Sequence, residues 1–71
     1  MKGKGLGLRV RLIRPNGETS FTLEFLTAME AEARFKRLVD ACTLDRWYGV
    51  RVQRLDTFGE IIQEQTIAKG A

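Results

Sequence analysis

The stretch "LGLRVRLIRPNGETSFTLEF" (residues 6–25) decides the fold, because it reads as two strands joined by a tight turn. Apolar and polar residues alternate over 6–13 and again over 19–25, which is the pattern of half-buried strands. The Pro-Asn-Gly segment between them favours a turn, since Asn and Gly accept positive φ. The sequence therefore predicts a β-hairpin with Asn16 and Gly17 at its tip.

The alternation also predicts the register of this hairpin, because a slip of one residue would place apolar side chains opposite polar ones. One face is expected to carry three apolar pairs, namely Leu8 with Phe25, Val10 with Leu23, and Leu12 with Phe21. The other face then carries arginines, with Arg9 opposite Glu24 and Arg11 opposite Thr22.

A helix is expected after the hairpin. Thr27 with Glu30 three residues later forms a capping box, which predicts a helix that begins at Ala28. Apolar residues recur at three- and four-residue spacing and form a single stripe. The stripe consists of Ala28, Ala31, Phe35, Leu38 and Cys42. We expect the helix to end near Cys42 or Thr43, with one face for a sheet and one for water.

Two further strands and a turn are expected after the helix, in "YGVRVQRL" (48–55), "DTFGE" (56–60) and "EIIQEQTIA" (60–68). In the third strand the inward positions are Tyr48, Val50 and Val52, and the outward ones are Arg51 and Gln53. Ile61 and Ile62 cannot both face inward in a regular strand. We therefore expect a β-bulge there, or an edge strand that meets a partner with its second face.

The element order predicts one small α+β domain over residues 1–71, with a four-stranded, mostly antiparallel sheet and one amphipathic helix on one face. Strand order 2-1-3-4 is one solution, and a sheet that pairs the second and third strands in parallel is another. Residues 1–5 are expected to be a flexible basic lead-in and residues 69–71 a frayed tail. Either order leaves the second face of the sheet uncovered.

Composition argues against several kinds of site. The chain has no histidine and one cysteine, Cys42, so an internal disulfide is impossible and a Cys/His zinc site lacks ligands. No carboxylate pair or activated thiol is apparent, so we expect no enzyme, metal or cofactor. No apolar run reaches the ~20 residues of a spanning helix, so no membrane partner is expected. The unpaired cysteine and the absence of signal-peptide features predict a cytoplasmic protein.

The small size of the chain favours a protein partner. A domain of this length buries only about 60% of its unfolded surface, and small scaffolds usually need a staple. Because no disulfide or metal is expected, we predict a non-enzymatic protein-binding module. It would be a homodimer or a small accessory, regulatory or inhibitory protein. The candidate partner-binding residues are Phe58 at a hairpin tip, Trp47, Ile61 and Ile62.

The charge distribution offers an alternative, binding of DNA or RNA. Residues 1–17 carry a charge of +5 and residues 18–71 a charge of −2, so the net charge of +3 arises in the first quarter of the chain. The candidate nucleic-acid-binding residues are Lys2, Lys4, Arg9, Arg11, Arg14 and Arg51. Arginines are also common on the solvated face of a strand. No aromatic residue is expected on the uncovered face to stack bases, so we prefer the solvated interpretation.

Overall fold

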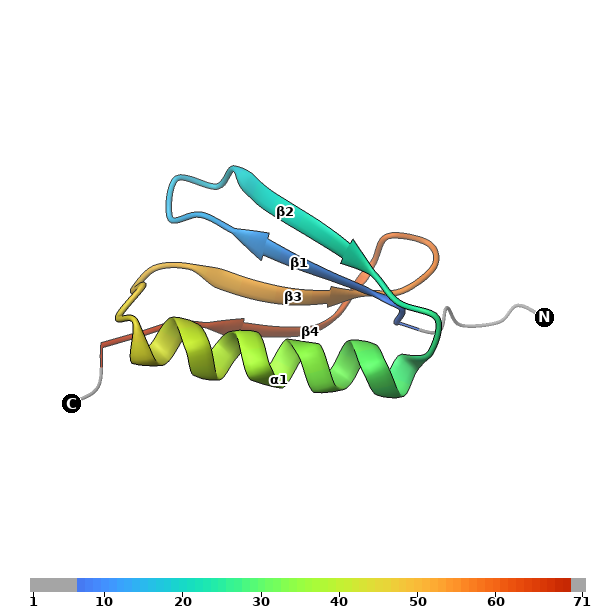
Figure 1. Ribbon diagram of the computed structural model, residues 1–71. Helices are drawn as coiled ribbons and strands as arrows, with labels where there is room; N and C mark the ends of the chain where they lie inside the picture. The colour runs from blue at the N-terminus through green and yellow to red at the C-terminus, as the bar shows by residue number, and fades with distance from the viewer. Residues whose placement is uncertain (1–6, 70–71) are drawn as a thin grey trace.

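The computed structural model describes residues 7–69. It contains β1 (Arg9–Ile13), β2 (Thr19–Glu24), α1 (Ala28–Leu44), β3 (Arg51–Leu55) and β4 (Ile61–Thr66). All neighbouring strands are antiparallel, the strand order is β2-β1-β3-β4, and α1 runs along the sheet (Figure 1). The α+β prediction is confirmed, and the antiparallel solution is the correct one. The predicted lead-in at 1–5 and the last two residues of the predicted tail lie outside the described residues.

The N-terminal hairpin has the predicted register. Val10 pairs with Leu23 and Leu12 with Phe21, while the backbone N–H of Phe25 donates to the carbonyl of Leu8 at 2.8 Å. The register shifts once, between Leu12 and Ile13, because Ile13 pairs with Thr19 and leaves Ser20 as an extra residue.

The turn of this hairpin is closed by its own polar groups. Asn16 Oδ1 accepts from the backbone N–H of Glu18 at 2.9 Å, and the N–H of Gly17 donates to the carbonyl of Arg14 at 2.8 Å. Gly17 has a φ of 92°, which a residue with a Cβ adopts only at a cost. The Asn-Gly tip therefore performs the role that its sequence predicts.

Helix α1 begins at Ala28, as predicted, and Thr27 is its N-cap. The hydroxyl oxygen of Thr27 accepts from the backbone N–H of Glu30 at 3.1 Å, which satisfies one of the free donors of the first turn. The helix ends at Leu44, one residue beyond the predicted end. The last turn is closed by the N–H of Asp45, which donates to the carbonyl of Ala41 at 2.9 Å.

The core lies between α1 and one face of the sheet, which we call the helix face. Val10 and Val52, neighbours on β1 and β3, are fully buried there. The whole cluster comprises Val10, Leu12, Ala31, Phe35, Cys42, Val50, Val52 and Ile67, with Phe25, Leu38 and Val39 at its margin. Of the predicted apolar stripe of the helix, Ala31, Phe35, Leu38 and Cys42 join the core or its margin, and Ala28 does not. Burial of each larger side chain contributes about 1.5–3 kcal/mol.

The third strand is shorter than expected, and the inward placement of Tyr48 is wrong. Strand β3 begins at Arg51, and Tyr48 is 40% exposed. Gly49 lies between them with a φ of 91°, so the extended alternation does not reach back to Tyr48. Val50 and Val52 do face the core as predicted.

The predicted bulge in the fourth strand is confirmed. Leu55 pairs with Ile61 and Arg54 with Gln63, so Ile62 is the extra residue. Both isoleucines are about half exposed. The bulge explains how two consecutive apolar residues occur in one edge strand.

Candidate functional site

Three of the candidate arginines share the sheet face opposite α1, which we call the open face. Arg9 and Arg11 alternate along β1 with residues of the core, and Arg51 does the same on β3. Arg14 lies in the β1–β2 turn and is exposed. Lys2 and Lys4 lie outside the described residues.

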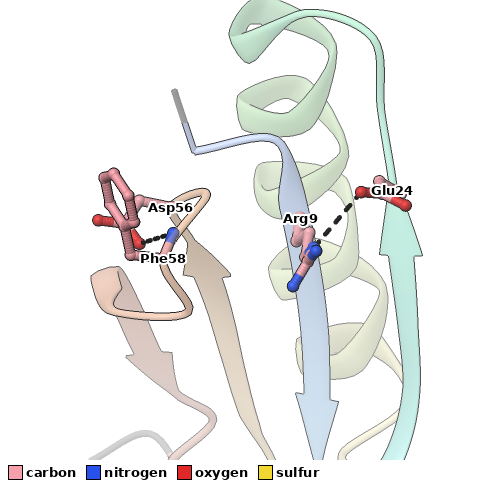
Figure 2. Close-up of polar contacts among 4 residues, drawn as sticks. All are labelled: Arg9, Glu24, Asp56 and Phe58. Atoms are coloured by element: carbon pink, nitrogen blue, oxygen red, sulfur yellow. Dashed lines mark hydrogen bonds and ion pairs between the residues drawn. The ribbon is translucent and has the colours of Figure 1, made fainter. Parts of the chain in front are cut away.

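The arginines of β1 already have protein partners. Arg9 Nε donates to Glu24 Oε2 across the β1–β2 pair at 3.4 Å (Figure 2). Arg11 donates to Gln53 Oε1 through Nε and Nη2, at 3.0 and 2.7 Å. Gln53 Nε2 in turn donates to Glu64 Oε2 at 2.6 Å. The open face therefore carries carboxylates beside its arginines, which lowers its positive potential.

The open face also shields its own apolar residues. Ile13 and Leu55 are buried although neither belongs to the helix-face cluster, and Gln53 is only 4% exposed. Arg11 precedes Ile13 by two residues and Arg51 lies opposite it, and the aliphatic stems of such side chains cover apolar neighbours. The face is bare of helices and strands among the described residues, but Ile13 and Leu55 are not available to a ligand.

The β3–β4 turn exposes Phe58 to solvent and is closed by hydrogen bonds to Asp56. Asp56 Oδ1 accepts from the backbone N–H of Phe58 at 2.9 Å (Figure 2) and from the backbone N–H of Glu60 at 2.8 Å. The turn is also closed by the N–H of Asp56, which donates to the carbonyl of Glu60 at 2.9 Å. Asp56 is only 7% exposed, whereas Phe58 is 69% exposed. Sequence reasoning identified Phe58 and missed Asp56, although an Asp two residues before the tip is a typical turn signal.

The four predicted partner-binding residues fall into two places. Phe58, Ile61 and Ile62 belong to the β3–β4 hairpin and are all exposed, and we call these three residues the hairpin cluster. Trp47, which is 51% exposed, belongs to the connection between α1 and β3 at the opposite end of β3 (Figure 1). The structure therefore does not unite Trp47 with the other three.

A second exposed apolar region, around β2, was missed from the sequence. Phe21 lies on the helix face but is 36% exposed, because α1 packs mainly on β3 and β1 and β2 stands clear of it (Figure 1). Where β2 leads into α1, Leu26 is 91% exposed. A shallow depression of about 430 Å³ is lined by Leu8, Glu24, Phe25 and Leu26. Strand alternation placed Phe21 and Phe25 on one face of the sheet, but it did not show how far the helix would extend over that face.

Cys42 is a buried thiol in the core. Burial and, secondarily, the negative charge of Asp45 raise its pKa above the ordinary value, so the reactive thiolate is disfavoured. Within residues 7–69 no cluster of three or more potential metal ligands occurs. No helix of the described chain is long and apolar enough to cross a membrane.

Comparisons of the chain with family models, with curated proteins and with solved structures find no match. The surfaces that bear on function are therefore the open face, the hairpin cluster and the exposed region around β2.

Proposed function

We propose that this protein is a non-enzymatic protein-binding module that forms a homodimer and serves as an accessory, regulatory or inhibitory protein. The observation that carries the proposal is the number of large apolar residues that the described chain leaves exposed, compared with the number of hydrophobic residues that it buries. Ten hydrophobic residues of the described chain are buried, and nine large ones are exposed. The exposed ones are Phe21, Leu26, Met29, Leu44, Trp47, Tyr48, Phe58, Ile61 and Ile62. Removing apolar surface of this extent from water favours association.

The hairpin cluster supports binding of a partner protein in addition to self-association. Aromatic side chains often contribute most of the binding free energy at protein interfaces. The two hydrogen bonds from the turn to Asp56 hold the backbone of Phe58 in place before any partner arrives. Such preorganisation lowers the entropy cost of association.

Sedimentation velocity at increasing protein concentration tests self-association. We expect a concentration-dependent shift from the 8.1 kDa chain to a species of twice that mass. A single 8.1 kDa species at all concentrations up to about millimolar would contradict the homodimer. Only a complex with a Kd well above that concentration would escape detection.

Nucleic-acid binding is the second candidate, because Arg9, Arg11 and Arg51 share the open face. The carboxylates of Glu24 and Glu64 on that face favour the protein-binding proposal over it. Fluorescence anisotropy of a labelled oligonucleotide separates the two candidates. Affinity that falls with salt would support the second one.

The matched variant for that experiment is the double substitution Arg9→Ala and Arg51→Ala. It removes two cations from the open face and leaves Arg11 to satisfy the buried amide of Gln53. Loss of the salt-dependent signal in this variant would assign binding to the open face. Equal binding by both proteins would exclude that face as the nucleic-acid site.

A further inference from the structure

The two edges of the sheet differ in how well they resist pairing with another strand. Strand β4 has a carboxylate at Glu64 in its middle, and a charge in the middle of an edge strand discourages edge pairing. Strand β2 has no charged residue from Thr19 to Leu23, and its one acid, Glu24, is paired with Arg9. Each strand has one bulge, at its second residue, Ser20 in β2 and Ile62 in β4, so the two edges differ in charge and not in their bulges. The free edge of β2 is therefore the less protected of the two.

The hydrogen bond from Phe25 N–H to the carbonyl of Leu8 shows which backbone groups of β2 are free. In an antiparallel pair, hydrogen-bonded positions alternate with non-bonded ones. Phe25 and Leu23 thus direct their backbone groups to β1, while Glu24 and Thr22 direct theirs to the free edge. These outward groups are a template for one further strand.

We propose that β2 pairs antiparallel with β2 of a second copy of this chain, about a two-fold axis at Thr22. The pairing joins two four-stranded sheets into one and closes the unprotected edge of both copies. This inference rests on the proposed self-association and specifies its surface.

The self-complementarity of β2 supports a second copy as the occupant. Directly opposite residues in an antiparallel pair share a face, so the axis must pass through a residue. With Thr22 at the axis, Phe21 meets Leu23 of the second copy on the helix face. They form a non-hydrogen-bonded pair, where side chains approach most closely. This contact covers the side of Phe21 that α1 leaves exposed.

Avoidance of like-charge contacts and the length of β2 favour this register over the registers with the axis one residue away. With Thr22 at the axis, Glu24 meets Ser20 of the second copy, so no like charges face one another. An axis at Phe21 would place Glu18 opposite Glu24 of the second copy, which is destabilising. An axis at Leu23 would pair Ser20 with Leu26, beyond the end of β2.

Two matched substitutions test the proposal. Thr22 and Thr66 are exposed residues on the open face of the two edge strands, β2 and β4. Each lies opposite an arginine of an inner strand, Arg11 or Arg51. Thr22→Glu and Thr66→Glu therefore make equivalent changes within one copy. Each new glutamate also lies two residues from an existing one, Glu24 or Glu64.

Sedimentation velocity on the full chain gives the readout. In the proposed dimer, Thr22→Glu places two carboxylates opposite each other at the axis, about 5.5 Å apart between Cα atoms. We expect the Kd of the dimer to rise by about tenfold or more. Thr66→Glu should dimerise like the wild type. Far-UV circular dichroism and urea midpoints of the two variants at low concentration check that both remain folded.

The other outcomes separate this inference from the proposed function. Dimerisation that survives Thr22→Glu and is lost with Thr66→Glu would place the interface at β4, which overturns this inference and retains the proposed function. A monomeric wild type overturns both. Amide hydrogen exchange provides a second readout, since the N–H groups of Thr22 and Glu24 should exchange slowly in the dimer and quickly after dilution. Protection of these amides by a different protein, with no self-association, would assign β2 to another partner.

The pairing leaves the hairpin cluster free in each copy. Phe58, Ile61 and Ile62 belong to the β3–β4 hairpin, and β4 is the edge of the sheet opposite β2. A dimer built through β2 would therefore present two copies of the cluster at the two outer edges of the joined sheet.

Discussion

Replacing Asp56 with alanine removes the single acceptor atom, Oδ1, that the backbone N–H groups of Phe58 and Glu60 share. The residue is only 7% exposed, while the turn that it organises is open to water. The substitution therefore tests whether these two hydrogen bonds stabilise the β3–β4 turn, or whether the turn only connects the two strands.

The expected magnitude follows from the two hydrogen bonds. Each bond to a charged acceptor contributes about 1.5–3 kcal/mol to stability. Water replaces part of this contribution, because Phe58 and Glu60 are exposed, so we expect a loss of about 2–3 kcal/mol in the free energy of unfolding. A domain of this length has roughly 4–10 kcal/mol in total. Asp56→Asn keeps an acceptor at the same position and should lose about 1 kcal/mol.

Urea unfolding followed by far-UV circular dichroism measures the effect, at a protein concentration held constant across variants. Asp40→Ala is the matched control, because Asp40 is an exposed aspartate on α1 and should change stability by less than about 0.5 kcal/mol. If Asp56→Ala unfolds at the same urea concentration as Asp40→Ala, the turn does not depend on this carboxylate and the reasoning is refuted.

Three further predictions concern the fold. Thr27→Ala should cost about 1 kcal/mol by removing the helix cap, and an unchanged thermal midpoint would show that the cap is dispensable. Gly49→Ala should cost about 1–3 kcal/mol in urea unfolding, because φ is 91° and the new Cβ would lie 3.2 Å from Pro15; a neutral result would mean that this loop rearranges freely. Burial raises the pKa of Cys42, so the folded state holds its proton more tightly than the unfolded state. Stability should be complete below the ordinary thiol pKa of about 8.5 and fall as the pH rises above it. The Cys42→Ala variant should show a flatter dependence over the same range, and parallel curves for the two proteins would argue against this coupling.

Much of the architecture followed from local pattern. The hairpin register, the capping residue Thr27, the apolar stripe of α1 and the bulge at Ile61 and Ile62 each depend on a spacing of a few residues. Such spacings set which side chains share a face and which backbone groups need a partner. They do not depend on how the elements pack against one another, so they could be predicted from the sequence before the tertiary structure was known.

The candidate site was predicted less completely. Phe58 was identified because an aromatic residue at a hairpin tip has little core to enter. The hydrogen bonds that Gln53 makes with Arg11 and with Glu64 could not be foreseen, because they join three strands. The order of these strands was open between two solutions. The exposure of Phe21 was also missed, since alternation alone placed it inward.

Local pattern in the chain was thus sufficient for the order of the elements, for the first hairpin and for the faces of most strand and helix residues, because each of these depends on residues close in sequence. It failed at Tyr48, where the third strand was predicted to begin too early. Tertiary structure alone decided the strand order, the hydrogen bonds that link Arg11 through Gln53 to Glu64, and the extent of sheet that α1 covers. These features depend on contacts between residues that are distant in sequence. Helix α1 packs mainly on β3 and β1, so it does not cover β2. That exposure is what makes the edge at β2 the proposed site of self-association.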